Sequence, residues 1–580
     1  MKRRRVGNAV FVQKSRAGKI TLIIVGAVLA LLLLLVTLGL WGSRGWLPAF
    51  VSGQFGPAFE VPATAVVDEP QEQPVRAFVS LESERPVFRV DDRYLSFAID
   101  LSQVTGGKWW DPDATRTEEG SGTVAAPIFD FSRPRLDAMV SALGPSYLRI
   151  GGSESDKIYY DMAERSIEAA EIPEGYESVL TGGQWDALNA FAIRNDLRVV
   201  FTLNAGPSAR NRRGDWDPSN ARELIEYTAL RGYPVEVWEL GNEVNNFWYV
   251  FGVGEQIGAR QYHEDSRKLM EILDEVDPDA RFGGQGGMIW PVFGEPLGLF
   301  FGMSHAAIRR NAEIQDVVSW HYYPQQSRRG PIASRRANPA RLLEPNNLNE
   351  AAHWAGRFDD SRDEYIPEAP LWVGETGNAQ FGGEPGLSDA YLGGLWWLDQ
   401  LGLLAQNEHA VVIRQSLTGM NYGLIDERTL APRPDYWNSV LWERLMGESV
   451  LDARVEALGE TSHAQAEKIR VYAHEHERGE DGGGEASAGR GSNAVSEVTF
   501  LVINLHHDRD AEIELDINSP VELYQLTAPD VYGREVLLNG VPFRLDASGL
   551  PQDWVFAPVR ANESRIVLPP LSYAFVVTEP

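Results

Sequence analysis

The sequence predicts an α/β protein in which a (β/α)8 TIM barrel is followed by a C-terminal β-sandwich domain and preceded by an N-terminal transmembrane helix. Three observations support this fold class. Short β-rich segments alternate with helical segments over residues 95–446, the pattern becomes all-β from residue 447, and a continuous apolar run occupies residues 20–41. The 580 residues are too many for one hydrophobic core, so at least two folded domains are expected.

The amino-terminal segment is predicted to anchor the chain in a membrane. Residues 20–41 are apolar over a length that crosses a bilayer, and the tail of residues 1–19 is basic. The positive-inside rule places this tail in the cytoplasm and the large domains after residue 76 outside it, in a periplasmic or extracellular position. A cleavable signal peptide is the alternative, but Gly42–Trp46 is a poor cleavage site. Residues 42–76 are expected to form an extended linker.

Residues 95–446 contain eight candidate strands separated by helical segments, which is the count of a (β/α)8 barrel. The candidates are Leu95–Leu101, Tyr147–Gly151, Val199–Asn204, Val235–Gly241, Arg281–Gly284, Val317–Tyr322, Leu371–Glu375 and Val411–Ser416. A doubly wound open sheet is the competing architecture, but no Gly-rich phosphate loop follows the first strand. We therefore expect a barrel with its active site at the carboxyl ends of the strands.

Residues 447–580 read as about seven short strands between turn residues, which is typical of a β-sandwich. Within them, residues 479–496 are rich in Gly, Glu and Ser and are predicted to be a disordered loop. Residues 77–94 also include an alternating strand pattern, and we expect this segment to join the sandwich.

Composition excludes several kinds of function. The chain has no cysteine, so disulfides and cysteine nucleophiles are ruled out, and no residue cluster has the spacing of metal ligands. We expect no cofactor. The net charge of −29 opposes binding to nucleic acid.

Two acids at strand ends are the candidate catalytic residues. Glu243 follows the fourth candidate strand directly after Asn242, and Glu375 ends the seventh. A retaining glycosidase uses two carboxyl groups about 5–5.5 Å apart, one as nucleophile and one as proton shuttle. Strands four and seven lie on opposing sides of an eight-stranded barrel, so these two acids can face one sugar ring.

Motifs spread through both predicted domains resemble glycoside hydrolase family 79, the heparanase and β-glucuronidase group in the clan of (β/α)8 retaining glycosidases. The motifs are Tyr147–Gly152, Trp238–Glu243, His321–Tyr323, Gly374–Thr376, Arg414–Gln415, Asn421–Tyr422, Pro434–Trp437, Val502–His506 and Pro569–Tyr573. The resemblance extends from about residue 77 to residue 580.

The resemblance implies a role for each candidate residue. Glu243 would be the general acid/base, Glu375 the nucleophile, and Asn242 a donor to the sugar 2-hydroxyl. His321 and Tyr323 would line the pocket beside the nucleophile.

Recognition of a uronic acid by relatives implies a second group of residues. The backbone amides of Gly382 and Gly383 and the hydroxyl of Tyr422 would hold the ring carboxylate, because glycines let the backbone approach an anion closely. Asp100 and Gln285 would contact sugar hydroxyls.

Departures from the family favour exo-acting β-glucuronidase activity on a carbohydrate substrate. Heparan-cleaving relatives carry an Arg pair after the fifth strand, where this chain reads Gly286–Trp290 without a positive charge. Residues 102–134 also lack the long excised linker of the vertebrate enzyme. The alternatives are an endo-β-glucuronidase acting on glycosaminoglycans, a hydrolase of neutral β-glycosides, and a non-catalytic carbohydrate-binding surface protein.

Overall fold

A computed structural model of the chain describes residues 60–62, 73–83, 85–111, 123–166, 171–295, 302–330, 333–477, 496–517, 519–551, 556–561 and 564–578. The chain divides into two compact units, residues 1–57 and 58–580, and the described residues belong to the second. The predicted tail 1–19 and transmembrane segment 20–41 lie outside the described residues, as do most of the linker 42–76 and of the loop 479–496, so these stay predictions. Within the described ranges, no helix is both long and apolar enough to cross a bilayer.

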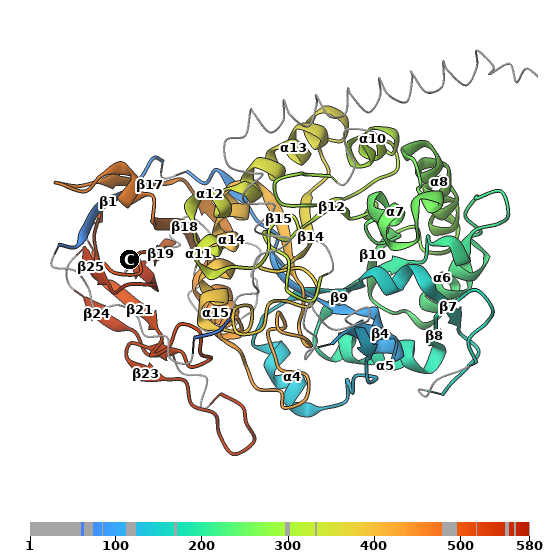
Figure 1. Ribbon diagram of the computed structural model, residues 1–580, viewed down its shortest axis with the longest axis horizontal. Helices are drawn as coiled ribbons and strands as arrows, with labels where there is room; N and C mark the ends of the chain where they lie inside the picture. Colours follow the sequence, from blue (N-terminus) through green and yellow to red (C-terminus); the bar gives the residue numbers. More distant parts are fainter. Residues whose placement is uncertain are drawn as a thin grey trace, which may run out of the picture. The chain divides into compact units, whose positions relative to one another are not determined.

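A curled sheet of parallel strands forms the centre of the α/β part (Figure 1). Its strands in spatial order are β11 (Arg281–Phe282), β10 (Val235–Leu240), β9 (Leu197–Leu203), β6 (Ser146–Gly151), β3 (Leu95–Asp100), β15 (His409–Arg414), β14 (Leu371–Thr376), β13 (Val318–Tyr322) and β12 (Gly287–Ile289). The first strand, β3, pairs with the last, β15. The predicted α/β class is confirmed, and this order is consistent with a (β/α)8 barrel.

The fifth predicted strand, Arg281–Gly284, is wrong in its bounds, because the structure divides this strand into two pieces. The first piece, β11, pairs with β10, and the second, β12, pairs with β13. Between them Gly284 and Gly286 have φ angles of +75° and +55°, which interrupt an extended backbone. A Cβ on Gly286 would lie 2.5 Å from Nε2 of His321, so the break leaves room for that ring.

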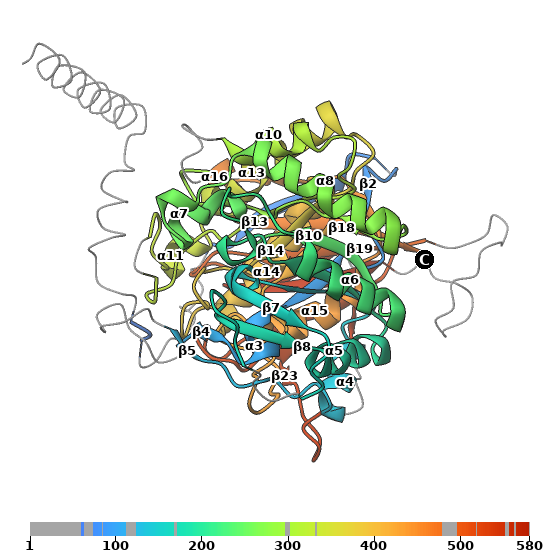
Figure 2. The same ribbon diagram turned by 90° about the vertical axis from the view of Figure 1, so that its right-hand side faces the viewer.

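Helices surround the curled sheet on its outer side (Figure 2). The longer ones are α5 (Gly182–Arg194), α6 (Ser219–Arg231), α8 (Ala259–Val276), α10 (Met303–Arg310), α13 (Glu350–Tyr365), α14 (Tyr391–Gln406) and α15 (Pro434–Leu445). The shorter ones are α3 (Leu101–Thr105), α4 (Pro134–Ser141), α7 (Phe247–Val250), α11 (Pro339–Leu342) and α12 (Pro345–Leu348). Two small pairs, β4 (Lys108–Trp110) with β5 (Thr123–Ala125) and β7 (Ile158–Asp161) with β8 (Ser178–Thr181), lie in loops.

Two further sheets share one apolar cluster, which is the arrangement of a β-sandwich. The smaller sheet contains β17 (Ala453–Ala457), β1 (Val75–Leu81), β20 (Ala511–Leu515) and β25 (Arg565–Leu568). The larger contains β2 (Phe88–Arg89), β16 (Ser449–Leu451), β18 (Ile469–Glu477), β19 (Ser496–Asn504), β26 (Ser572–Thr578), β21 (Val521–Thr527), β22 (Leu537–Leu538) and β23 (Val541–Pro542), with β24 (Val559–Ala561) beside β21. The segment 77–94 thus supplies a strand to each sheet.

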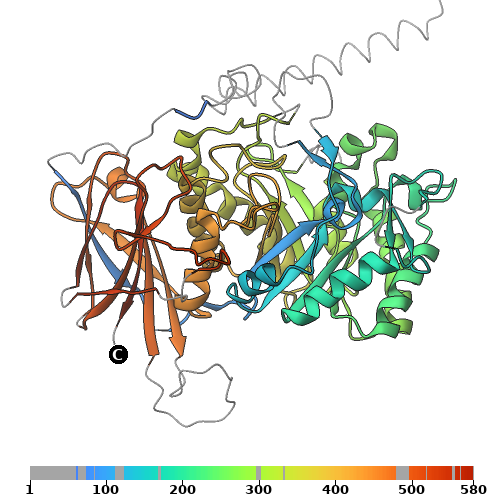
Figure 3. The same ribbon diagram turned by 90° about the horizontal axis from the view of Figure 1, so that it is seen from below.

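Helix α14 packs between the α/β part and the β-sandwich (Figure 3). Its residues are buried nearly all round, as expected for a helix covered on both sides. Asp399 in α14 accepts hydrogen bonds from Nε of Arg470 at 2.6 Å and from the hydroxyl of Tyr472 at 2.7 Å, both on β18. One helical turn further, Gly402 lies directly against the Tyr472 ring.

This contact predicts opposite effects for two glycine-to-alanine changes in helices. A Cβ at Gly402 would lie 2.1 Å from Cγ of Tyr472, so Gly402→Ala should lower the free energy of unfolding by about 1–3 kcal/mol through overpacking. The control is Gly356 in α13, where an added Cβ would meet no atom within 4 Å. Gly356→Ala should raise stability by about 0.5–1 kcal/mol through helix propensity. Urea unfolding of both variants checks this, and equal effects would contradict the packing argument.

Candidate active site

Glu243 projects from a tight turn at the carboxyl end of β10. Gly241 and Glu243 both have left-handed φ angles, +78° and +52°, and Glu243 is not a glycine, so its backbone is held in an uncommon conformation. The Glu243 N–H donates to the carbonyl of Gln285 at 3.1 Å. The buried side chain of Asp156 stabilises this turn. Its carboxylate accepts hydrogen bonds from the backbone N–H groups of Asn242 and Ala205, each at 2.9 Å.

Glu375 lies near the end of β14, where the pairing with both neighbouring strands is irregular. Such irregularities re-aim side chains at strand ends. The Glu375 carboxylate accepts two short hydrogen bonds, from Nη1 of Arg149 at 2.8 Å and from the hydroxyl of Tyr323 at 2.6 Å. Glu375 is therefore held between two donors that stabilise a negative charge.

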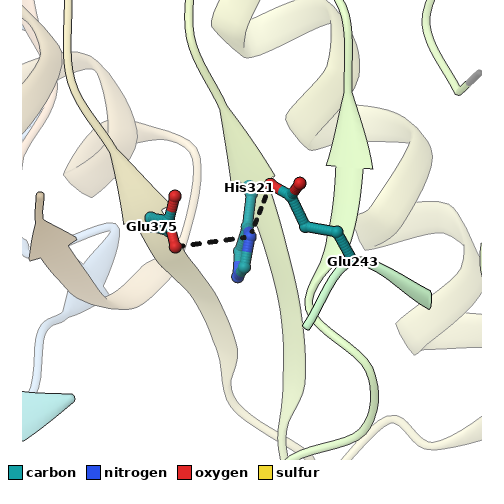
Figure 4. Close-up of side chains that lie close together, drawn as sticks. All are labelled: Glu243, His321 and Glu375. Carbon is teal, nitrogen blue, oxygen red and sulfur yellow. Dashed lines mark hydrogen bonds and ion pairs between the residues drawn. The ribbon is translucent and has the colours of Figure 1, made fainter. Parts of the chain in front are cut away.

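The structure brings Glu243 and Glu375 together with His321 between them (Figure 4). Nδ1 of His321 lies 3.1 Å from Oε1 of Glu243 and 3.9 Å from Oε2 of Glu375. One oxygen of each glutamate and this nitrogen all lie within 4.8 Å of one another. An oxygen of Glu243 thus lies within 4.8 Å of an oxygen of Glu375, which is compatible with the carboxyl separation of about 5–5.5 Å in retaining glycosidases.

These three side chains could in principle bind a cation, because each offers one ligand atom. The guanidinium of Arg149, however, already contacts the same oxygen of Glu375 that faces His321. A divalent ion there would be repelled by this buried positive charge. The chemistry of the site thus favours acid and nucleophile roles over metal binding.

Arg149, on β6, forms hydrogen bonds with several buried side chains of the site. Its guanidinium is completely buried and donates to Oε2 of Glu239 at 2.9 Å and to Oδ1 of Asn242 at 2.9 Å, in addition to Glu375. Thr202 also donates to Oε2 of Glu239, at 2.7 Å. Residues from β6, β9, β10 and β14 are therefore joined by one hydrogen-bonded network.

The two glutamates have different electrostatic surroundings. Burial, and then the negative charge of Glu375, raise the pKa of Glu243 well above its usual value. Burial, and then the positive charge of Arg149, lower the pKa of His321 well below its usual value, so the ring beside Glu243 is neutral. A protonated Glu243 next to a charge-stabilised Glu375 can supply the proton and the nucleophile of a double displacement.

Of the residues predicted to bind a uronate, Tyr422 lies beside Tyr323, and Gly383 lies against the backbone of Tyr422. The rings of Tyr323 and Tyr422 have centroids 6.5 Å apart. Burial, and then the carboxylates of Asp100 and Glu375, raise the pKa of Tyr422 well above its usual value, so these groups lie within electrostatic reach of its hydroxyl. A Cβ on Gly383 would lie 2.8 Å from the backbone nitrogen of Tyr422.

Asp100 is the last residue of β3, within electrostatic reach of Tyr422, whereas Gln285 lies in the break between β11 and β12, beside the Glu243 turn. Asp100 caps α3 by accepting the N–H and hydroxyl of Ser102, and burial raises its pKa to about 7 against these hydrogen bonds. The Gln285 amide donates to Oγ of Ser304 at 3.1 Å. Gln285 contributes to the site through its carbonyl, which holds the Glu243 turn.

Three buried charged residues of the site, Arg149, Glu239 and Asp156, are not among the candidate site residues that the sequence predicts. The signal was present for two of them, since Arg149 and Glu239 interrupt otherwise apolar strands and buried charges require partners. Asp156 lies in a short 3-10 helix, Ser153–Lys157, and no local pattern marks it.

Comparison with known proteins agrees with this geometry. Residues 76–402 match the description "Glycosyl hydrolase family 79, N-terminal domain". Mouse heparanase is 29% identical, with 94% of this chain and 98% of that protein covered. Baicalin-beta-D-glucuronidase from Scutellaria baicalensis is 28% identical, with 85% and 90% covered.

Solved structures share the fold at much lower identity. A 4-O-alpha-L-rhamnosyl-beta-D-glucuronidase from Fusarium oxysporum has a TM-score of 0.56 at 14% identity, covering 89% of this chain and 100% of that one. An arabinofuranosidase of family GH51 from Xanthomonas axonopodis pv. citri has a TM-score of 0.59 at 15% identity, covering 87% and 100%. Because the family description matches more than half of the chain, the protein belongs to glycosyl hydrolase family 79 and is a glycoside hydrolase.

Proposed function

We propose that this glycoside hydrolase is a retaining exo-β-glucuronidase, which releases glucuronic acid from the end of a substrate. The observation that carries the proposal is the pair of carboxyl groups. Oxygens of Glu243 and Glu375 lie within 4.8 Å of each other, and among the described residues an arginine forms an ion pair with Glu375 but not with Glu243. This asymmetry supports assigning Glu243 as acid/base and Glu375 as nucleophile.

The first step forms a glycosyl-enzyme ester. A carboxylate oxygen of Glu375 attacks the anomeric carbon, the bond from that carbon to the leaving oxygen breaks, and the proton of Glu243 passes to the leaving oxygen. Arg149 and Tyr323 orient Glu375 for this attack, since each donates to a different oxygen. Neutral His321 leaves the proton on Glu243.

The second step releases the sugar. The Glu243 carboxylate accepts a proton from water, the water oxygen attacks the anomeric carbon, and the bond to Glu375 breaks. Asn242 supports both transition states. Its amide oxygen accepts from Arg149 at 2.9 Å, which orients the NH2 group as a donor to the sugar 2-hydroxyl.

Glucuronic acid fits better than a neutral sugar because the backbone of Gly382 and Gly383 and the hydroxyl of Tyr422 offer donors for a carboxylate. Tyr422 lies beside Tyr323, which donates to Glu375, and Gly383 lies against the backbone of Tyr422. Release from a chain end fits better than internal cleavage of a sulfated polymer. The loops that flank Glu243, residues 244–258 and 283–295, contain no Lys or Arg to bind sulfate groups. Internal cleavage and neutral β-glycosides remain the alternatives to be tested.

We expect Glu243→Gln and Glu375→Gln to lower kcat/KM for an aryl β-glucuronide by about 10²–10⁴-fold or more. Loss of the acid should be more severe for an alkyl glucuronide than for a nitrophenyl glucuronide, because a nitrophenolate leaves with little protonation. The matched control is Glu236→Gln, at the amino end of the same strand β10. Glu236→Gln should keep near-full activity. If both site variants also kept near-full activity, the assignment would be wrong.

A second prediction concerns the position of the bond that is cleaved. On an oligosaccharide with β-glucuronate at its non-reducing end and also within the chain, the protein should release only monomeric glucuronate at early times. Size analysis of the products measures this. Early appearance of intermediate-sized fragments would show internal cleavage, and release of glucose from an aryl β-glucoside at a comparable rate would indicate a neutral-sugar hydrolase.

A third prediction follows from the raised pKa of Glu243. Below the ordinary pKa of a glutamate, the side chain is protonated in both the folded and the unfolded state, so it has no pH-dependent effect. As the pH rises above that value, the unfolded state releases the proton while the folded state retains it, and folding becomes less favourable. Glu243→Gln should therefore melt at a higher temperature than wild type at pH 7.

This gain in melting temperature should shrink as the pH is lowered toward about 4. Thermal melting over a pH series measures it. A gain of equal size at both ends of the series would show that burial of Glu243 is not linked to proton binding.

A further inference from the structure

The turn that carries Glu243 depends on support from other segments. Gly241 and Glu243 have left-handed φ angles of +78° and +52°. For Glu243, which has a Cβ, this conformation is less favourable than ordinary helical or extended backbone. Such a residue keeps its conformation only where the surrounding structure holds it there. The groups that hold this turn therefore decide where the Glu243 carboxyl lies.

Asp156 joins this turn to the end of the neighbouring strand β9. Its Oδ2 accepts the N–H of Asn242 and its Oδ1 accepts the N–H of Ala205, each at 2.9 Å. The side chain comes from a third segment, the 3-10 helix Ser153–Lys157 after β6. One carboxylate thus fixes the ends of β9 and β10 relative to each other.

The position of Asp156 is itself fixed by close packing. Asp156 is 1% exposed, and its backbone carbonyl lies so close to Gly206 that an added Cβ there would be 2.0 Å from the carbonyl oxygen. A Cβ on Gly241 would lie 3.4 Å from Oδ1 of Asp156. The 3-10 helix therefore has little room to move toward either turn, and the carboxylate is a fixed point for both.

The charged groups around Asp156 have closer partners of their own. Burial raises the pKa of Asp156 to about 7, while its two N–H donors, and then the charges of Arg210 and Lys157, oppose that rise. Arg210 forms an ion pair with Asp265 at 2.8 Å, and Lys157 forms one with Glu154 at 2.7 Å. In the described part of the chain, the hydrogen bonds of the Asp156 carboxylate are those from the two turns.

Asn242 and Glu243 depend on this support to different degrees. The Asn242 side chain has an anchor of its own, because its Oδ1 accepts from the charged guanidinium of Arg149 at 2.9 Å. The Glu243 carboxyl has a weaker anchor, a contact of 3.1 Å with the neutral ring of His321. Loss of the bond from Asn242 to Asp156 would therefore affect the position of the Glu243 carboxyl more than that of the Asn242 amide.

We propose that Asp156 is a positioning residue for acid/base catalysis: its carboxylate holds the turn Gly241–Glu243, which keeps the Glu243 carboxyl directed at the leaving oxygen and then at the attacking water. The negative charge of Asp156 acts in the same sense, because it adds to burial and to Glu375 in raising the pKa of Glu243. The inference rests on the proposed role of Glu243 and adds a residue that acts through its turn.

The experiment compares an alkyl and a nitrophenyl β-glucuronide in Asp156→Asn. This variant keeps the shape and one acceptor oxygen, but it loses the charge and places an NH2 group against a backbone N–H. For the alkyl glucuronide, kcat/KM should fall by about 10–100-fold, because its leaving oxygen needs the proton of a well-placed acid. For the nitrophenyl glucuronide, kcat/KM should fall much less, because nitrophenolate leaves with little protonation.

The second step gives an independent readout. In Asp156→Asn, kcat for the nitrophenyl glucuronide should fall, because water needs the base to attack the glycosyl-enzyme. Azide attacks the anomeric carbon and breaks the bond to Glu375 without giving up a proton, so it should restore part of this kcat and yield glucuronyl azide. Adding Asp156→Asn to Glu243→Gln should lower kcat no further, because the base is already lost.

The matched control is Asp265→Asn. Asp265 is also a fully buried carboxylate that accepts a backbone N–H, that of Trp216 at 3.2 Å. It lies on α8, and its partners within the described ranges lie outside the turn of Glu243. The ratio of kcat/KM for the alkyl over the nitrophenyl glucuronide should equal that of wild type. Asp156→Ser is a second test variant, whose hydroxyl accepts a hydrogen bond without an opposing NH2 group, and it should show the same selective loss as Asp156→Asn.

The outcomes separate the possibilities. Equal loss on both substrates, no rescue by azide, or a further fall in the double variant overturns the inference and leaves the role of Glu243 standing. Thermal melting reports whether the variants fold. If neither Asp156 variant folds while Asp265→Asn does, Asp156 is required for the fold and the inference is overturned. A wild type that cleaves neither glucuronide refutes the proposed function itself.

Discussion

The fully buried guanidinium of Arg149 is the interaction on which the rest of the site depends. It bonds Glu239, Asn242 and Glu375, three side chains from two distant strands, and so fixes their distances from one another. Two carboxylates could not remain buried here without it, because an unpaired buried charge costs several kcal/mol. The curled sheet makes this possible by placing β6 between the strands that carry the acids on either side.

The same cation also makes the two glutamates unequal. Glu375 shares its charge with Arg149 and Tyr323, whereas Glu243 faces neutral His321 and the negative field of Glu375. Burial then has opposite consequences for the two groups. It strengthens the attraction between Glu375 and Arg149, and it makes the charged form of Glu243, which faces neutral His321, less favourable. The proposed acid and nucleophile roles therefore depend on the surroundings of the two residues and not on residue type, as both residues are glutamate.

A second buried arginine, Arg329, holds the loop of Gly382 and Gly383, because its guanidinium donates to both of their carbonyls. Arg329 lies behind a glycine loop, and its neighbours extend through Asn421 and Asp389 to Arg534 in the β-sandwich. The β-sandwich therefore contributes to the support of the segments around Asp389 and Asn421 as well as to the packing of α14.

The sequence by itself determined the alternation of strands and helices, the switch to an all-β pattern at residue 447 and the two acids at strand ends, because these depend on local periodicity and on short motifs. It also determined the family, from motifs such as Trp238–Glu243. Only the tertiary structure decided that the fifth strand is split, since His321 needs the space at Gly286. Only the tertiary structure revealed the partners of Arg149, Asp156 and Arg329, because charge pairing between residues up to 226 positions apart leaves no periodic signal along one chain.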